Sequence, residues 1–337
     1  MRKIAFSALL LLLTLALACS DDEGDDSNGP GPTGPPRVIA FQAASSPTLD
    51  SVADPLWDSA TAKTIEVTTS ALGPQLPREE RQAALAVSDQ VLVEAIRYEN
   101  DLYLRLTWDD ESHDVWPKRW VVDSLVSGFP DFSQGTTASE DQLLFMFAGL
   151  AEDGWDTWHW RALTTAIEEF APNEVRGFAE GATLRGIALQ ADSGNLEIAL
   201  PNLNDGFNQP TYFHPDSSEF TGYILYQHIA VDPPTPTAGW SAGQYVPGYR
   251  IDSSMATPAK AEARASRWDI RAVSRWSGGA QYQVVLSRPM TSGFSDDLEM
   301  VGQDSVKVRV GIANDFDFRF DIGSTRQGFT SEFWLIL

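Results

Sequence analysis

The sequence has one cysteine, Cys19, and only four histidines and five methionines among its 337 residues. A single thiol excludes an intrachain disulfide, a Cys-rich zinc or iron–sulfur site, and covalent haem attachment through a Cys-x-x-Cys-His motif. Positive charge is also scarce, because 24 Lys and Arg residues face 47 Asp and Glu residues, a formal net charge of −23. Such a surface repels phosphate backbones, so we expect no nucleic-acid partner.

Long hydrophobic runs are missing except at the start of the chain. Residues 4–18 are largely apolar, follow a basic Arg-Lys pair, and end in small residues before Cys19. The run is too short for a comfortable membrane-spanning helix and is typical of a cleaved signal peptide. We therefore predict a lipoprotein signal peptide at residues 1–18 and lipidation of Cys19, although an ordinary secretory leader is the alternative. The protein would be exported and lipid-anchored to the bacterial cell envelope, at the periplasmic or surface face of the outer membrane.

The segment after Cys19 cannot pack. Residues 20–26 are mostly acidic and residues 29–36 are mostly Gly and Pro. Like charges repel and Gly/Pro-rich chain stays extended, so residues 19–37 are predicted to be a lipidated tether. With no repeat and no second long linker beyond it, residues 38–337 are predicted to form a single domain.

Alternating apolar residues predict that this domain is an all-β, antiparallel β-sandwich with long irregular loops and a few short helices. The helices are expected near residues 77–85 and 162–170. Residues 202–263, rich in Pro, Gly and aromatics, are expected to form loops that line one end of the sandwich. The expected strands are residues 64–69, 91–98, 101–108, 142–147, 282–287, 306–312 and 333–337.

Two short patterns are set aside on physical grounds. Gly239-Trp-Ser-Ala-Gly243 matches the G-x-S-x-G nucleophile elbow, but its surroundings are Pro-rich and lack the strand and helix that the elbow needs. The acidic pairs Asp109-Asp110 and Asp296-Asp297 lack EF-hand spacing. Since Asp is preferred in turns, we expect these pairs to be solvated turns after strands.

The aromatic segment Trp155-Asp-Thr-Trp-His-Trp160 is the most informative local feature. It follows a predicted strand that contains Met146. Large aromatic side chains are common core material, and they also form sugar-stacking platforms or the walls of planar cofactor pockets. A histidine nitrogen or a methionine sulfur is a standard axial ligand of haem iron.

The order of motifs resembles the haem-binding domain family named after the gamma subunit of ethylbenzene dehydrogenase, which is related to family-nine carbohydrate-binding modules and DOMON-like sandwiches. The resemblance covers most of residues 47–337. The matching segments are the Trp-containing opening at 47–58, the Trp-Asp-Asp strand at 100–110, the strand at 140–147, W-H-W-[KR]-A at 158–162, V-P-G at 246–248, S-R-x-D-I-x-A at 266–272, and an approximate R-x-L-x-T-G-x-x-D-D at 288–297 with Met290 at the leucine position.

The resemblance implies a non-covalent b-type haem. Gamma subunits of this type hold it between a methionine and a lysine, the methionine lying in a Met-Gly stretch before the W-x-W segment. Here residues 148–154 occupy that stretch and contain no methionine. By chemistry and position, His159 is the first candidate ligand of the iron, then Met146 and Met290, with Trp158 and Trp160 as pocket walls and His228 and His214 as outside candidates.

The sequence thus predicts an exported haem protein that transfers single electrons and is not itself an enzyme. An acidic surface suits a basic redox partner, such as a small cytochrome or an oxidoreductase subunit. Two alternatives stay open: a haem-free module that binds a carbohydrate or another planar ligand, and an assembly lipoprotein that has lost the cofactor. Kinship of fold alone does not choose among them.

Overall fold

Strands dominate the part of the chain that the structure describes. Contacts divide the chain into two units, residues 1–34 and 35–337, and the strands that the structure describes lie in the second. The predicted signal peptide, Cys19 and nearly all of the tether lie outside the described residues. The computed structural model describes residues 34–48, 53–69, 87–114, 120–126, 129–134, 140–150, 154–163, 165, 169–178, 186–191, 199–201, 225–226, 242–243, 245–246, 248–251, 269–277, 280–295, 297–314 and 327–337.

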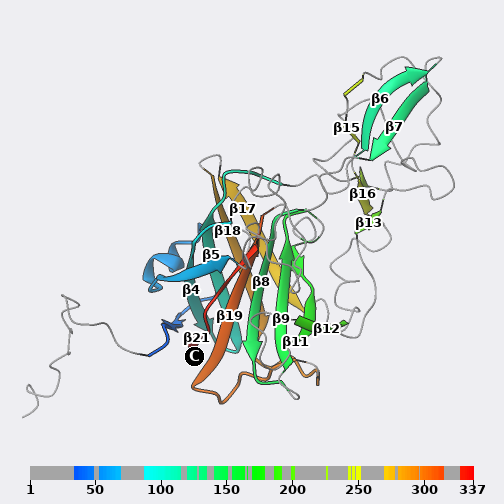
Figure 1. The fold of residues 1–337 in the computed structure, drawn as a ribbon. Helices are drawn as coiled ribbons and strands as arrows, with labels where there is room; N and C mark the ends of the chain where they lie inside the picture. Colours follow the sequence, from blue (N-terminus) through cyan, green and yellow to red (C-terminus); the bar gives the residue numbers. More distant parts are fainter. Residues whose placement is uncertain are drawn as a thin grey trace, which may run out of the picture. The chain divides into compact units, whose positions relative to one another are not determined.

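One layer of the fold is an antiparallel run of six strands, with the short strand β2 (Phe41–Gln42) added in parallel to β4. Figure 1 shows its long strands β4, β5, β17 and β18. In spatial order the six are β10 (Phe170–Ala171), β17 (Ile270–Ser277), β18 (Gln281–Pro289), β5 (Asp101–Asp109), β4 (Gln90–Tyr98) and β3 (Lys63–Thr69).

The second layer is also antiparallel and is joined to the first where β20 pairs with β3. Two further strands extend this layer next to β19 (Ser305–Ala313). Strand β21 (Phe333–Ile336) pairs with β19 in antiparallel orientation, and β1 (Arg37–Ile39) pairs with β21 in parallel. In spatial order the six strands of the layer are β20 (Gln327–Thr330), β19 (Ser305–Ala313), β8 (Gln142–Ala148), β9 (Gly154–Arg161), β11 (Asn173–Phe178) and β12 (Gly186–Ala191).

Two small three-stranded sheets accompany the layers. The first contains β15 (Tyr245–Val246), β6 (Trp120–Val126) and β7 (Phe129–Gln134), and the second contains β13 (Ala199–Pro201), β16 (Tyr249–Ile251) and β14 (Leu225–Tyr226). The helix among the described residues is the 3-10 turn η1 (Pro55–Ser59), capped by the Asp54 carboxylate, which accepts from the Leu56 amide at 2.8 Å. No helix in the described ranges has the length and apolar character needed to cross a bilayer.

Period-two alternation places one hydrophobic core between the layers, as the sequence predicts. On β4, Val91, Val93 and Ala95 face inward, and on β8, Leu143, Phe145 and Phe147 do so. Burial of these apolar faces is the main stabilising term of such a sandwich. The rest of the core comes chiefly from Leu102, Leu104, Leu106 and Trp108 of β5, Trp158 and Trp160 of β9, Tyr282, Val284 and Leu286 of β18, and Val306, Val308, Val310 and Ile312 of β19.

The predicted fold class is confirmed, and so are the seven predicted strands within one or two residues of their ends. The opening segment buries Trp57, as its resemblance implied. The helix near residues 162–170 is wrong where it can be checked, because residues 162, 163, 165 and 169 lie in turns and Phe170 begins β10. The helix near 77–85 and most of residues 202–263 lie outside the described residues.

Candidate functional site

Strand β9 separates the predicted site residues onto two faces. Trp158 and Trp160 point into the core between the layers, whereas Trp155, Thr157 and His159 point to the opposite, outer face of the sheet. All three tryptophans are buried, so none of them forms an aromatic platform open to water.

The imidazole of His159 is buried and held by polar partners from two neighbouring strands. Nδ1 lies 3.3 Å from the Glu174 carboxylate on β11, and Nε2 lies 2.8 Å from the Gln142 side-chain amide on β8. The Gln142 atom in this contact is Oε1, which can only accept, so the 2.8 Å distance places a proton on Nε2 that is donated to Gln142. Arg161, two residues along β9, brings its Nε to 3.4 Å from the same nitrogen.

A metal-ligating histidine commonly donates one ring N–H to a carboxylate and binds the metal through its other nitrogen. Glu174 beside Nδ1 matches that pattern, but Nε2 would first have to give up its proton and its contact with Gln142 Oε1. With that change, His159 fits the role of one axial ligand of a haem iron.

Met146 lies on the same outer face as His159. In the β8–β9 register Met146 is opposite Thr157, and Leu144 is opposite His159. Met146 packs in a small apolar cluster with Leu144, Trp155 and Phe329. Since adjacent strands present these two side chains side by side, they cannot reach one iron from opposite sides of a porphyrin. The described residues of this face thus offer one axial ligand and no opposed pair.

Met290 lies elsewhere, with the two tryptophans. It follows β18, is buried in the core between the layers, and its backbone is fixed by bonds from its N–H to Asn100 O (2.6 Å) and from Met300 N–H to its own carbonyl (2.8 Å). Trp160 packs edge-on against Trp108 with ring centres 6.0 Å apart. The structure therefore brings His159 and Met146 together and separates both from Trp158, Trp160 and Met290.

Other histidines and motifs add little at this site. His113 is half-buried and stacks on Trp276 with ring centres 4.9 Å apart; His214 and His228 lie outside the described residues. At the G-x-S-x-G segment, Ala242 and Gly243 form a turn with Gly243 at φ +84°, where a nucleophile elbow needs a helix to begin. In the ranges the structure covers, no group of three His, Cys, Asp or Glu side chains is arranged to hold a metal ion by itself.

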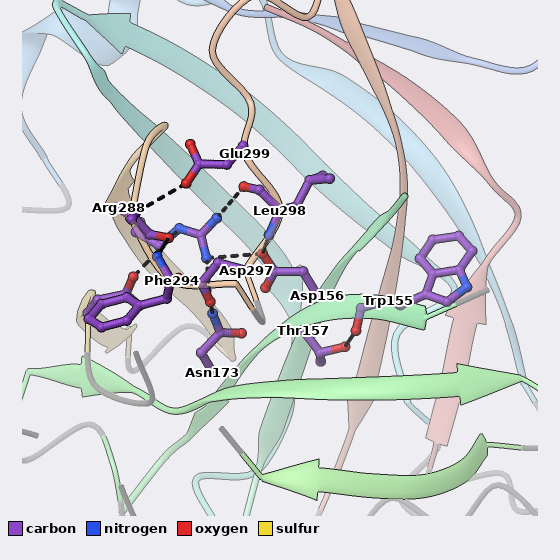
Figure 2. Close-up of polar contacts among 12 residues, drawn as sticks. Trp155, Asp156, Thr157, Asn173, Arg288, Phe294, Asp297, Leu298 and Glu299 are labelled. Carbon is purple, nitrogen blue, oxygen red and sulfur yellow. Dashed lines mark hydrogen bonds and ion pairs between the residues drawn. The ribbon is translucent and has the colours of Figure 1, made fainter. Parts of the chain in front are cut away.

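A second polar cluster, absent from the predicted site, lies in the interior and joins the two layers (Figure 2). Arg288 on β18 is fully buried, and its Nη1 contacts Asp156 Oδ2 on β9 at 3.0 Å and Asp297 Oδ1 at 3.3 Å. The other end of the guanidinium donates to the Leu298 carbonyl at 2.9 Å, and its Nε lies 3.9 Å from Asp269. We call Arg288, Asp156, Asp269 and Asp297 the arginine clasp.

Burial controls the titration of the clasp. Desolvation raises the pKa of Asp269 to about 8 and that of Asp297 to about 6, against the opposing attraction of Arg288. Desolvation also raises the pKa of Asp156. Although burial disfavours the charged guanidinium, the surrounding carboxylates raise the pKa of Arg288.

The expectation that the acidic pairs form solvated turns is wrong for Asp110 and Asp297, which are both buried. Asp110 caps a turn by accepting from the Ser112 amide at 3.0 Å and from Asn314 at 3.2 Å, and desolvation raises its pKa to about 6. Turn propensity identifies the local bend but not whether tertiary structure covers it.

Sequence reasoning also missed Gln142 and Glu174. Gln142 is the polar first residue of an otherwise apolar strand, and that break in polarity was the available signal. Glu174 had none, because its approach to His159 depends on the pairing of β11 with β9, in which Glu174 is opposite Thr157.

Comparison with known proteins identifies the family. No curated protein matches the sequence. Among solved structures, a chain from Bacteroides uniformis ATCC 8492, described as a carbohydrate-binding protein, is similar with a TM-score of 0.35 and 8% identity over 90% of this chain and 91% of that one. The family model described as ethylbenzene dehydrogenase matches residues 54–314, well over half of the sequence. The chain therefore belongs to the ethylbenzene dehydrogenase family.

Proposed function

We propose that this protein binds a b-type haem non-covalently at the outer face of β8 and β9, with His159 as one axial ligand, and exchanges single electrons with a partner protein. The observation that carries the proposal is the buried imidazole of His159, oriented by Glu174, in a chain of the ethylbenzene dehydrogenase family. Met146 supplies apolar contact beside the ligand, and Trp158 and Trp160 support β9 from its other face.

Charge on the same face suits the cofactor. Arg161 pairs in register with Gln142, and Arg309 of β19 pairs with Met146, so the two arginines lie toward opposite ends of the face. Guanidinium groups are good partners for carboxylates such as the haem propionates. Burial raises the energetic cost of a charged guanidinium at Arg309 and lowers its pKa, so a bound anion there would be stabilising.

The chain's own residues have limited tasks in this function. Haem supplies the one-electron couple. Glu174 would orient the imidazole ring through Nδ1, Nε2 would give up its proton and its contact with Gln142 Oε1 in order to bind iron, and the apolar contacts around Met146 would exclude water. Since these tasks involve no substrate bond, we propose an electron-transfer or binding subunit rather than an enzyme.

The proposed location follows from the leader and Cys19. A lipid on Cys19 would anchor the protein to the bacterial cell envelope, and residues 20–37 would serve as the tether. The excess of acidic residues favours a basic partner, such as a small cytochrome or an oxidoreductase subunit, through salt-sensitive attraction.

Absorption spectra test the proposal. Purified protein saturated with haem should give sharp Soret and alpha bands on reduction, and His159→Gly should lose or shift them. Added imidazole should restore the bands in His159→Gly, because the small molecule refills the vacated ligand position. His113→Ala is the matched control and should keep the wild-type spectrum.

Two results would overturn parts of the proposal. Absence of bands with saturating haem excludes the haem function and favours the ligand-binding or assembly alternatives. Wild-type bands in His159→Gly, with circular dichroism showing an intact fold, place the iron elsewhere in the chain.

A further inference from the structure

The arginine clasp carries more negative than positive charge in a largely buried place, where the side chain of Asp269 is 16% exposed and the other three are buried. Three carboxyl groups surround one guanidinium, so full ionisation would leave a net charge of −2 between the layers. Asp156 and Arg288 are at most 1% exposed and Asp297 is 4% exposed. Unbalanced charge in such surroundings is expensive, and a buried acid is neutralised by a cation or by a proton.

Several carboxyl oxygens of the arginine clasp also lack a hydrogen-bond partner. Asp156 has one oxygen bonded to Arg288 and to the Leu298 amide, while its other oxygen has no hydrogen-bond partner. Neither oxygen of Asp269 has a hydrogen-bond partner, nor does Oδ2 of Asp297. Buried polar atoms almost always have a hydrogen-bond partner. Carboxyl oxygens that lack one indicate that at least one of these carboxyl groups is protonated.

A metal ion is the less suitable way to balance this charge. The described residues contain no group of three acidic or histidine side chains arranged around a metal position, and the guanidinium lies among the carboxylates. The carboxyl groups of Asp269 and Asp297 lie against the same guanidinium, 3.9 Å from Arg288 Nε and 3.3 Å from Arg288 Nη1, and repulsion between them raises the pKa of Asp269, so one proton on either group relieves both.

We propose that Asp269 and Asp297 form a proton-binding site that holds one proton between them at neutral pH, and that loss of this proton loosens Leu298 from strand β9. Among the described residues, the groups facing this pair are Arg288 from β18, Asp156 from β9, and the uncharged side chains of Asn173 from β11 and Ser292. Asn173 donates to Asp297, so it favours the charged form of that carboxyl and leaves Asp269 as the better resting place for the proton.

The link to the segment after β18 is direct. Leu298 N–H donates to Asp156 at 2.8 Å and the Leu298 carbonyl accepts from Arg288, so both ends of this peptide depend on the clasp. When Asp269 and Asp297 are both ionised, two carboxylates compete with Asp156 for one guanidinium. Repulsion among the three then weakens the contact of Leu298 with β9.

The direction of the pH effect follows from proton binding. A carboxyl whose pKa is raised from 3.8 in the unfolded chain to about 8 in the folded protein favours folding at low pH and loses that contribution as pH rises through about 8. While the folded state holds one extra proton, the unfolding equilibrium constant rises about tenfold per pH unit.

Urea unfolding of the purified protein from pH 5 to pH 9 tests the site. The ratio of wild-type to Asp269→Asn unfolding constants should rise by about tenfold per pH unit between pH 5 and pH 7, since asparagine imitates the protonated acid without titrating. Asp297→Asn is the second variant in case the first does not fold. Glu66→Gln, an exposed carboxylate on β3, is the control and should leave the profile parallel to wild type.

Hydrogen exchange at Leu298 tests the consequence for the segment. Its amide should exchange faster at pH 9 than at pH 7, beyond the intrinsic base catalysis, in wild type but not in Asp269→Asn. Parallel pH profiles of wild type and both Asn variants would overturn the proposal. So would recovery of stability at pH 9 on adding Ca²⁺, because a metal rather than a proton would then balance the charge.

Discussion

Replacing Arg288 by methionine tests how strongly the arginine clasp holds the two layers together. Methionine keeps most of the volume of the side chain and removes the guanidinium. Four interactions are lost at once: the ion pairs with Asp156 at 3.0 Å, Asp297 at 3.3 Å and Asp269 at 3.9 Å, and the hydrogen bond to the Leu298 carbonyl at 2.9 Å. The guanidinium also leaves the face of Trp158, 5.3 Å from the ring centre.

The size of the effect follows from burial. Removing one partner of a buried ion pair typically costs about 3–5 kcal/mol, because the remaining charge stays buried and uncompensated. Asp156 is fully buried, so water cannot replace the lost donor. We therefore expect Arg288→Met to lower the free energy of unfolding at pH 7 by about 3–5 kcal/mol.

Urea unfolding followed by tryptophan fluorescence measures this difference, and Lys307→Met provides the matched control. Lys307 pairs with Glu332 at 3.2 Å, but both side chains are about 40% exposed. An exposed pair contributes about 0–1 kcal/mol, so the control should change stability very little. If Arg288→Met costs no more than Lys307→Met, the clasp does not join the layers and the argument from burial is refuted.

Two further substitutions test packing and buried polarity in the same unfolding assay. Gly328→Ala should lower the free energy of unfolding by about 1–3 kcal/mol through overpacking, because the added Cβ would lie 2.6 Å from Val67 Cγ1. Gly34→Ala is the control and should be neutral, because a Cβ there meets open space. Equal effects of the two substitutions would contradict this argument. Tyr282→Phe should cost about 1–3 kcal/mol, because the buried Asp141 carboxylate loses the hydroxyl that donates to it at 2.9 Å; a neutral result would mean that water replaces the donor.

The strands were predictable because their signal is local. Alternation of apolar and polar residues on β4, β5 and β19 gives both the strand and the face that it buries, and the buried residues of these strands follow that pattern. On β9 the same rule separates Trp158 from His159. Treating the aromatic segment as one pocket wall overlooked this alternation, which the sequence already contained.

The polar partners were not predictable, because they come from strands far apart in the sequence. Glu174 reaches His159 only through the β9–β11 register, and Arg288 reaches Asp156 only because β18 and β9 lie in opposite layers. No local propensity encodes which buried acid meets which base. Such contacts depend on the topology of the whole sandwich.

The family match covers residues of the arginine clasp as well as the candidate haem ligand, so it does not by itself establish haem binding. Asp269, Arg288 and Asp297 all lie in segments whose sequence resembles the family, and in the folded protein they contact one another in the interior rather than the outer face that carries His159. All three lie within residues 54–314, the range that the family model matches, and none of them is a haem ligand candidate. A chain can therefore keep the fold while it changes or loses an axial ligand, so the spectrum of the His159 variant decides the cofactor independently of the family assignment.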